Sequence, residues 1–251
     1  VYTATFTPTA DGATTINVAA GGFSDASGNT NSAATEFNWL SDQTAPALSI
    51  TTIASDGYVS ASELSGGFAI TGAATGANGQ DVTVTYGGVT DSDTVTVANG
   101  AWTVTICDDE DCSGISTQGL VAVTANVDDA AGNSANPASG NGNQDTVVPT
   151  MTITASQGSS GFTSNDAALS LTFTSSESTS NFAVGDIQVS NCGLSAFAAS
   201  GGSTTVYTAT CTATADGAVT IDVAASGFTD TAANGNSAAT QFTWTQDDKG
   251  P

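Results

Sequence analysis

The chain repeats part of its own sequence. Residues 1–46 align with residues 206–251 without a gap, at an offset of 205, and 29 of the 46 positions are identical. The alignment also places Trp39 on Trp244, so the match exceeds a shared bias toward Thr, Ala and Gly. A chain with such a repeat is expected to fold as a series of similar units.

A weaker repeat of about half that length lies inside the long one. Pro46, Pro149 and Pro251 mark its boundaries, which gives units of 103 and 102 residues by subtraction. This is the size of one β-sandwich, and short alternating runs rich in Thr and Val are separated by Gly, Asn, Asp and Ser. We predict an all-β fold with two complete, antiparallel sandwiches of about seven strands each, at 46–148 and 149–251.

The expected strands follow from the alternation of apolar and polar residues. In the last unit they are 151–155, 168–174, 186–190, 194–198, 205–212, 218–224 and 240–245. In the preceding unit they include 68–72, 82–86, 94–98, 102–106 and 120–127.

Residues 1–45 match only the C-terminal half of such a sandwich. Half a sandwich cannot bury its inner face, so its apolar residues would lack the opposite sheet. We expect the missing strands to come from residues that precede this segment in a longer chain. Strand donation between the subunits of a polymer is the alternative.

The charge balance excludes several function classes. The chain has 24 Asp and Glu residues, one Lys (Lys249), and no Arg or His, for a net charge of −23. Nucleic-acid binding is not expected, because it needs Lys and Arg to neutralise phosphates. Imidazole and amine catalysis are excluded as well, and nothing marks two carboxylates as a glycosidase pair, so we do not predict an enzyme. No apolar run reaches about 18 residues, so no membrane insertion is expected in this segment.

Four cysteines fit two disulfides. Cys107 and Cys112 flank a short acidic loop, and Cys192 and Cys211 lie on two expected strands of the last unit. Phe6 occupies the position of Cys211 in the other copy of the repeat, on the inner face. A cysteine that replaces an inward Phe is most simply explained by a partner in the same domain, which is Cys192; free buried thiols are the alternative. Disulfides indicate an oxidising compartment outside the cytoplasm.

Carboxylates gather near the expected unit boundaries. Several carboxylates at one seam without a cation would repel one another, and a hard divalent ion with six to eight oxygen ligands relieves that repulsion. We therefore predict calcium, with solvated surface charge as the alternative. The candidate ligands are Asp25, Asp42, Asp56, Glu63, Asp129, Asp145, Glu177, Asp186, Asp230 and Asp247.

A family resemblance covers the whole chain. It rests on Leu-Thr-Phe-Thr-Ser-Ser-Glu177, Val-Gly-Asp186-Ile, Asp-x-x-Gly-Asn, and a closing Phe-x-Trp before an Asp and Pro linker. These motifs resemble bacterial immunoglobulin (Ig)-like repeat domains of large secreted adhesins and other cell-surface proteins. The resemblance implies tandem Ig-like β-sandwiches, arranged as beads on a string, and the same calcium ion.

Together these observations predict a non-enzymatic stalk or spacer. It would belong to an extracellular bacterial surface adhesin or filament, with neighbouring copies of the repeat as partners and bound calcium as the stiffening element. Two alternatives remain. One is an Ig-like module that binds a surface glycan or host protein, and the other is the protomer of a strand-exchanged extracellular polymer.

Overall fold

The computed structural model describes residues 1–91, 95–108 and 112–249. By density of contacts the chain divides into two compact units. The first contains Val1–Ile53, Ala69–Glu110 and Ala122–Asn141, and the second contains Ala54–Phe68, Asp111–Val121 and Gly142–Pro251. This division does not follow the repeat boundaries at residues 46 and 149, which remain a prediction.

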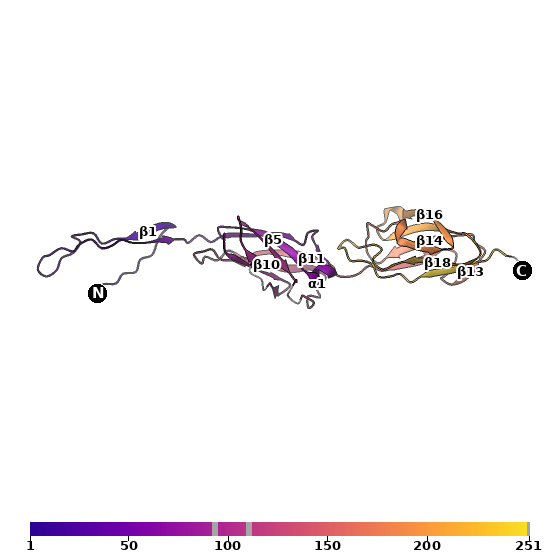
Figure 1. Cartoon of the computed structure of the whole chain (residues 1–251), viewed down its shortest axis with the longest axis horizontal. Helices are drawn as coiled ribbons and strands as arrows, with labels where there is room; N and C mark the ends of the chain where they lie inside the picture. Colours follow the sequence, from indigo (N-terminus) through magenta and orange to yellow (C-terminus); the bar gives the residue numbers. More distant parts are fainter. Residues whose placement is uncertain (92–94, 109–111, 250–251) are drawn as a thin grey trace. The chain divides into compact units, whose positions relative to one another are not determined.

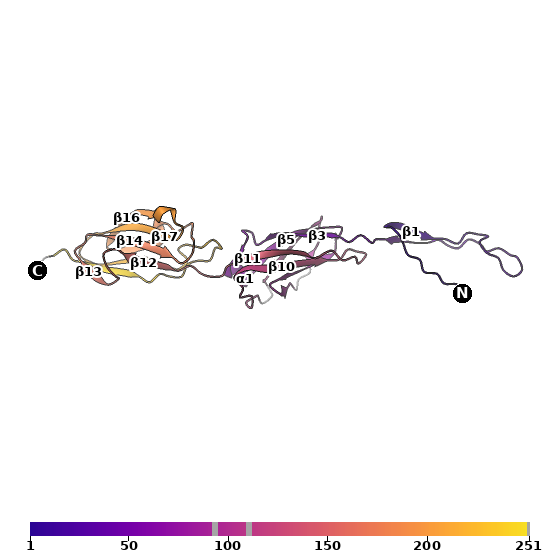
Figure 2. The ribbon, with the colours of Figure 1, turned by 180° about the vertical axis from the view of Figure 1, so that it is seen from behind.

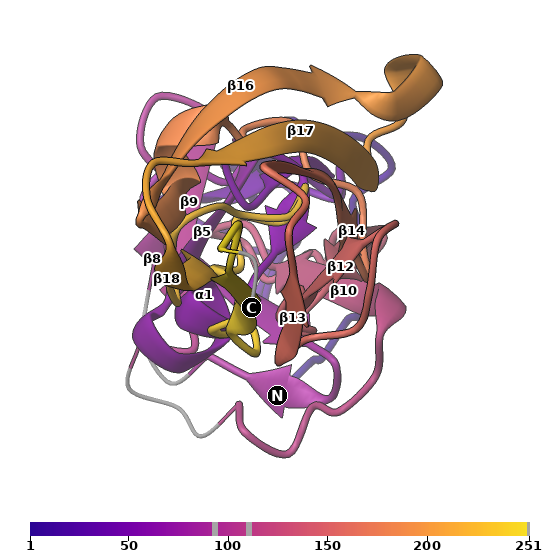
Figure 3. The ribbon, with the colours of Figure 1, turned by 90° about the vertical axis from the view of Figure 1, so that its right-hand side faces the viewer.

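The second unit contains a sandwich of two four-stranded sheets. One sheet has the order β12 (Met151–Ala155), β14 (Ala168–Ser175), β17 (Val206–Ala213), β16 (Cys192–Ala199). The other has the order β13 (Phe162–Ser164), β19 (Phe242–Gln246), β18 (Gly217–Val223), β15 (Ile187–Ser190). Figure 1 shows β14 and β16 in one layer above β18 and β13, and the end-on view in Figure 3 shows β16 beside β17.

The core of this sandwich follows from alternation along the strands. Leu169, Leu171 and Phe173 of β14 are buried, while the residues between them face outward or are half-buried. Val219 and Ile221 of β18 are buried from the other sheet in the same apolar cluster. Each such side chain contributes about 1.5–3 kcal/mol when removed from water, so this two-sided burial is the main stabilising term.

The predicted all-β class is confirmed, and all seven strand runs predicted for 149–251 are present within a few residues of the expected bounds. An eighth strand, β13, was not predicted, because three residues are too few to show alternation. Phe162 and its neighbours pair with β19 in the parallel direction, so the sandwich is not purely antiparallel. Figures 1 and 2 both show β13 at the end of the sandwich nearest the C-terminus.

Residues 47–144 form two further sheets. The first has the order β3 (Ala47–Ile53), β5 (Phe68–Thr75), β9 (Ala101–Ile106). The second has the order β4 (Tyr58–Val59), β11 (Ala138–Gln144), β10 (Gly119–Val127), β6 (Asp81–Tyr86), β7 (Val89–Thr90), with β8 (Val95–Thr96) also on β6. The first residue of the predicted run 94–98 lies outside the described residues. Gly72 makes room for Trp102, since a Cβ at Gly72 would lie 2.2 Å from the indole ring.

One short α-helix, α1 (Ala61–Gly66), was not predicted. Ser60 and Glu63 form a capping box at its start: the Glu63 carboxylate accepts a hydrogen bond from the Ser60 backbone N–H at 2.9 Å, and the Ser60 side chain accepts one from the Glu63 N–H. The pattern Ser-x-x-Glu signals such a start. Six residues without a buried face gave no periodic pattern that would have revealed the helix.

Residues 1–45 form a single hairpin of β1 (Gly12–Ile16) and β2 (Phe37–Ser41). Gly12 pairs with Ser41 and Ile16 with Phe37, the same register, shifted by 205, as between β18 and β19. Residues 1–8 match β17 in sequence and yet form no strand. The reason is that β17 pairs with β14 and β16, and residues 1–45 hold no counterpart of either strand.

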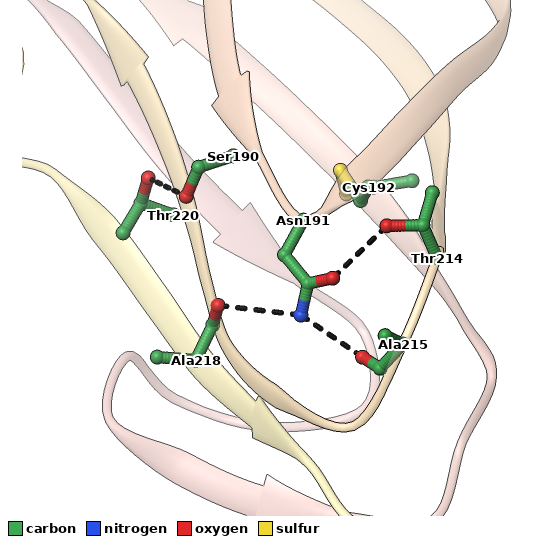
Figure 4. The surroundings of a disulfide bond; sticks show 8 residues. Ser190, Asn191, Cys192, Thr214, Ala215, Ala218 and Thr220 are labelled. Atoms are coloured by element: carbon green, nitrogen blue, oxygen red, sulfur yellow. Dashed lines mark hydrogen bonds between the residues drawn. A yellow bond between two sulfur atoms is a disulfide. The ribbon is translucent and has the colours of Figure 1, made fainter.

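The described cysteines are all disulfide-bonded. Cys192 of β16 is bonded to Cys211 of β17, with their Cα atoms 5.8 Å apart, and Cys211 is fully buried. Figure 4 shows the turn before Cys192, where the Asn191 side chain donates to the carbonyls of Ala215 and Ala218 and accepts from Thr214. Cys107 and Cys112 form the other disulfide.

The Cys192–Cys211 disulfide predicts a measurable loss of stability on removal. The cysteines are 19 residues apart, so closing that loop restricts the unfolded chain, and replacing both by Ala should destabilise the domain by about 3 kcal/mol. Urea unfolding of the double variant measures this. The double variant Cys107→Ala, Cys112→Ala is the control and should leave the transition of residues 149–246 in place. An unchanged midpoint after removal of Cys192 and Cys211 would contradict the prediction.

Candidate metal centre

The Asp-x-x-Gly-Asn motif folds into a loop closed by its own aspartate. Asp25 Oδ1 accepts backbone N–H groups from Ser27 and Asn29, both at 2.9 Å, and Oδ2 accepts the Asn29 side-chain amide at 2.9 Å. Asp129 repeats these contacts with Ala131 and Asn133, each at 2.8 Å. These hydrogen bonds, with the one from the Asn side chain foremost, lower the pKa of both aspartates. Both carboxylates are therefore held as loop closures.

The third copy of the loop departs from this pattern. Asp230 accepts the backbone N–H of Asn234 at 2.9 Å and its side-chain amide at 3.0 Å. Ala233 adopts φ +65°, in the left-handed region where the other copies have Gly28 and Gly132. A side chain in that region costs about 1 kcal/mol or more, so this loop tolerates backbone strain that the others avoid.

The Asn that ends each motif also reaches a neighbouring segment. Asn133 Nδ2 donates to the carbonyl of Asp42 at 3.1 Å, and Asn234 Nδ2 donates to the carbonyl of Asp145 at 2.8 Å. The Asn234 side-chain oxygen also accepts the backbone N–H of Ala61, the first residue of α1, at 3.0 Å. Asn234 is almost fully buried, so the Asp230 loop is anchored to both α1 and the segment after β11.

Three predicted ligands come together within the second unit. Asp145 follows β11, Glu177 follows β14, and Asp230 lies in the loop after β18; one carboxylate oxygen from each lies within 4.8 Å of the others. Asp145 is held by its backbone N–H, which donates to Val59 O at 3.0 Å. The three side chains line a cavity of about 460 Å³ together with Tyr58 and hydroxyl-bearing residues, which are Ser176, Ser178, Thr205 and Thr231.

The electrostatics of this cluster are unfavourable without a cation. Burial raises the pKa of Glu177, and the charges of Asp145 and Asp230 raise it further. Glu177 Oε1 is buried and has no hydrogen-bond partner among the described residues. The chain's single Lys pairs elsewhere, with Lys249 Nζ 3.2 Å from Asp216. The cluster thus joins three carboxylates with no neutralising side chain in the part of the chain that the structure describes.

The other predicted ligands are not assembled into a second group of three among residues 1–91, 95–108 and 112–249. Their carboxylates make local contacts instead. Asp42, Asp56 and Asp247 accept N–H groups two residues ahead, Glu63 caps α1, and Asp186 accepts the Ala183 N–H. The acidic loop between Cys107 and Cys112 falls largely outside the described residues. Calcium ligation by these residues remains a prediction.

The sequence alone does not single out the Asn residues that anchor the loops. Asn133 and Asn234 stand in it only as the last residues of the motifs that begin at Asp129 and Asp230. Recurrence of Asn at the end of each motif was the available signal, because an amide can close its own loop and donate to a second acceptor. The distant acceptors, Asp42 O and Asp145 O, carried no signal in sequence.

The sandwich of residues 151–246, with carboxylates in the loops at one end, is the architecture of an Ig-like domain. Residues 145–245 match the family model described as the bacterial Ig-like domain. Through this segment the chain belongs to the bacterial Ig-like domain family, as its motifs predicted. No curated protein matches the chain. None of the described helices is long and apolar enough to span a membrane.

Several solved structures are similar to the chain. A Ca²⁺-stabilized adhesin with which an Antarctic bacterium binds ice has 24% identity over 94% of this chain, with a TM-score of 0.46. The chain spans 56% of the length of that structure. A bacterial Ig-like domain from the M. primoryensis ice-binding adhesin has 32% identity over 39% of this chain and 96% of that domain, with a TM-score of 0.30. A 1.5-MDa bacterial ice-binding adhesin has 19% identity over 88% of this chain and 70% of that one, with a TM-score of 0.44.

The raised pKa of Glu177 predicts a pH dependence in the metal-free protein. The folded state keeps the proton to higher pH than the unfolded state, so stability should fall as pH rises above the ordinary Glu pKa of 4.5. Glu177→Gln should remove this decrease and stabilise the metal-free protein at neutral pH. Urea unfolding in EDTA from pH 4 to 8 measures both effects. Glu36→Gln, at an exposed site, is the matched control. An equal slope in the wild type and Glu177→Gln would refute the prediction.

Asn234 predicts a second stability effect. Asn234→Ala removes buried hydrogen bonds to Asp145, Asp230 and Ala61, and leaving such groups unpaired costs about 2 kcal/mol. Asn29→Ala, the same change in the exposed copy of the loop, should cost less, since its amide bonds only to Asp25. Chemical unfolding of the two variants compares them. Equal losses of stability in the two variants would show that the hydrogen bonds from Asn234 to Asp145 and Ala61 do not stabilise the protein.

Proposed function

We propose that this chain is a structural spacer segment of an extracellular, adhesin-related bacterial protein, and that calcium bound by Asp145, Glu177 and Asp230 stiffens it. The Ig-like family, the internal repeat and the disulfides support an extracellular scaffold. The carboxylate cluster carries the calcium part of the proposal. We assign the cluster the role of binding an ion and propose no catalytic reaction for it.

The donor set fits a hard divalent ion. Calcium takes six to eight oxygen ligands, and carboxylates, hydroxyls, backbone carbonyls and water all serve. The residues supply three carboxylates, of which Glu177 offers a buried oxygen without a hydrogen-bond partner among the described residues. Asp230 already accepts hydrogen bonds from Asn234, which orient its carboxylate and leave lone pairs available. His and Cys ligands, which zinc favours, are not offered by the cluster.

The three ligands connect segments that are distant in sequence. Asp145 follows β11, in the stretch that leads to the predicted boundary at residue 149, whereas Glu177 and Asp230 belong to loops of the following sandwich. A shared ion would hold the stretch after β11 against those loops and would cancel their repulsion. Restricting that stretch limits bending between successive units, which is the property that a spacer needs.

The chain contains a natural comparison for this site. Ala77 lies two residues after β5, as Glu177 lies two residues after β14. In the first unit Asp129 and Asp42 are the counterparts of Asp230 and Asp145, because the Asn133 amide donates to both of them. The position that corresponds to Glu177 holds no carboxylate there. We therefore expect calcium to bind more tightly at Asp145, Glu177 and Asp230 than at Asp42 and Asp129.

Calcium titration tests the proposal. At about a hundredfold excess over Kd, a ligand specific for the folded state adds about 2.7 kcal/mol of stability. Thermal unfolding in EDTA and then in millimolar calcium should show a higher melting temperature, and isothermal titration should give one tight site per chain. Small-angle scattering should show a less flexible particle with calcium.

Matched variants locate the site. Glu177→Gln should abolish the calcium-dependent stabilisation, whereas Glu36→Gln should retain it. Ala77→Glu supplies the missing carboxylate in the first unit and tests whether a second site can be created. No calcium effect on stability in the wild type, or an undiminished effect in Glu177→Gln, would overturn the calcium site.

A further inference from the structure

The stretches that follow β2, β11 and β19 share one local conformation. In each stretch the carboxylate of an aspartate accepts the backbone N–H two residues ahead, which closes a short turn. The pairs are Asp42 with Thr44 at 3.1 Å, Asp145 with Val147 at 3.1 Å, and Asp247 with Lys249 at 3.2 Å. This hydrogen bond uses neither the carbonyl of the aspartate nor the N–H of the next residue. The peptide group that joins those two residues is therefore available for partners outside the turn.

The N–H of each of these peptide groups donates to a side chain that lies before an earlier strand. The pairs are Gln43 with Asp11 Oδ1 at 2.6 Å, Thr146 with Gln118 Oε1 at 3.0 Å, and Asp248 with Asp216 Oδ1 at 3.1 Å. Each acceptor directly precedes a glycine at positive φ, which begins β1, β10 or β18. Asp and Gln have a side-chain oxygen in common, so the recurring requirement at this position is a hydrogen-bond acceptor.

The carbonyl of two of these peptide groups accepts a hydrogen bond from an asparagine further along the chain. Asn133 Nδ2 donates to Asp42 O at 3.1 Å, and Asn234 Nδ2 donates to Asp145 O at 2.8 Å. Each amide also donates to the aspartate of its own motif, which fixes the orientation of the amide. Because a trans peptide group directs its C=O and its N–H to opposite sides, these partners hold each peptide group from both sides.

The same arrangement recurs in the two compact units, each of which contains one complete set of partners. Asp42 and Gln43 are exposed, so water could satisfy their backbone groups, and burial does not explain why protein partners recur. Ordering an exposed stretch of backbone costs conformational entropy that a single hydrogen bond hardly offsets. Two hydrogen bonds to one peptide group polarise each other and can hold the stretch together. The recurrence therefore indicates a constraint on backbone conformation.

We propose that the Asp42–Gln43 and Asp145–Thr146 peptide groups act as locks, which keep the stretches after β2 and β11 in one conformation without calcium. The positioning residues are Asp11 and Asn133 for the first lock and Gln118 and Asn234 for the second. The inference deepens the proposed spacer function, because a fixed connecting stretch limits bending between successive units. It also means that the backbone that carries the Asp145 carboxylate is fixed before an ion binds.

Amide hydrogen exchange of the full chain, measured by NMR in EDTA, tests each lock separately. In the wild type the Gln43 and Thr146 amides should exchange about tenfold or more slowly than amides of unstructured peptides. Gln118→Ala removes the acceptor of the Thr146 N–H and should abolish the protection of Thr146, while Gln43 stays protected as an internal control. Gln118→Glu keeps an oxygen acceptor on a side chain of the same length and should retain the slow exchange of Thr146.

Removing the donor on the opposite side distinguishes a lock from a simple turn. Asn234→Ala leaves the Gln118 acceptor in place, so a turn held by Gln118 alone would keep the Thr146 amide protected. A lock needs both partners, so Thr146 should lose most of its protection in this variant. Asn133→Ala makes the same test at Gln43 and does not depend on the folding of residues 151–246.

Three results would overturn the proposal. The first is unprotected exchange of Gln43 and Thr146 in the wild type in EDTA. The second is unchanged exchange of Thr146 in either Gln118→Ala or Asn234→Ala. The third is protection that arises only after calcium is added, because the ion would then be what fixes the stretch. All the expected results are obtained in EDTA, so failure of the calcium site would leave them unchanged and is distinguishable from failure of the locks.

Discussion

Every sheet in this protein has one apolar face, and the rest of the structure depends on whether that face is covered. In residues 151–246 two four-stranded sheets cover each other, and Phe173, Ile221 and Trp244 are buried between them. The related hairpin of residues 12–41 has no opposing sheet among the described residues, and its aromatic side chains are exposed. Burial of these side chains supplies most of the favourable free energy of folding. Residues 206–246 therefore form part of a packed sandwich, whereas the similar residues 1–41 form only a hairpin.

The near absence of cationic side chains determines how the carboxylates are accommodated. Salt bridges are scarce, and Lys249 with Asp216 is the pair found among the described residues. Asp25 and Asp129 are stabilised by hydrogen bonds within their own loops, which lower the pKa of each. Asp145, Glu177 and Asp230 are instead brought close together, and the pKa of Glu177 is raised, first by burial and then by the charges of Asp145 and Asp230. Local loop closure satisfies isolated carboxylates, whereas clustered carboxylates repel one another unless a proton or a cation neutralises part of their charge.

The candidate site shows how a scaffold fold acquires a specific property. The apolar side chains of the sandwich strands form the core. The three carboxylates all lie outside these strands, after β11, after β14 and after β18. Loops are free to vary because they do not carry the core. Asn234 links these loops by hydrogen bonds to Asp145, Asp230 and Ala61, so the carboxylates are positioned by the protein itself. In residues 47–144 the position two residues after β5 holds Ala77, and the described residues there contain no group of three carboxylates.

The sequence by itself determined the features that depend on neighbouring residues. Alternation placed the strands of residues 149–251, the repeat placed β1 against β2 in the register of β18 and β19, and the Asp-x-x-Gly-Asn motif closed its own loop. The cysteine substituted for an inward Phe pointed to the Cys192–Cys211 pair. What tertiary structure decided was everything that depends on partners distant in sequence. It left residues 1–8 without a strand, gave β13 a parallel partner, and brought three of the ten candidate carboxylates, Asp145, Glu177 and Asp230, within 4.8 Å of one another. Local patterns specify the conformation of a segment, but the distances between loops depend on how complete sheets pack, and no local pattern encodes that packing.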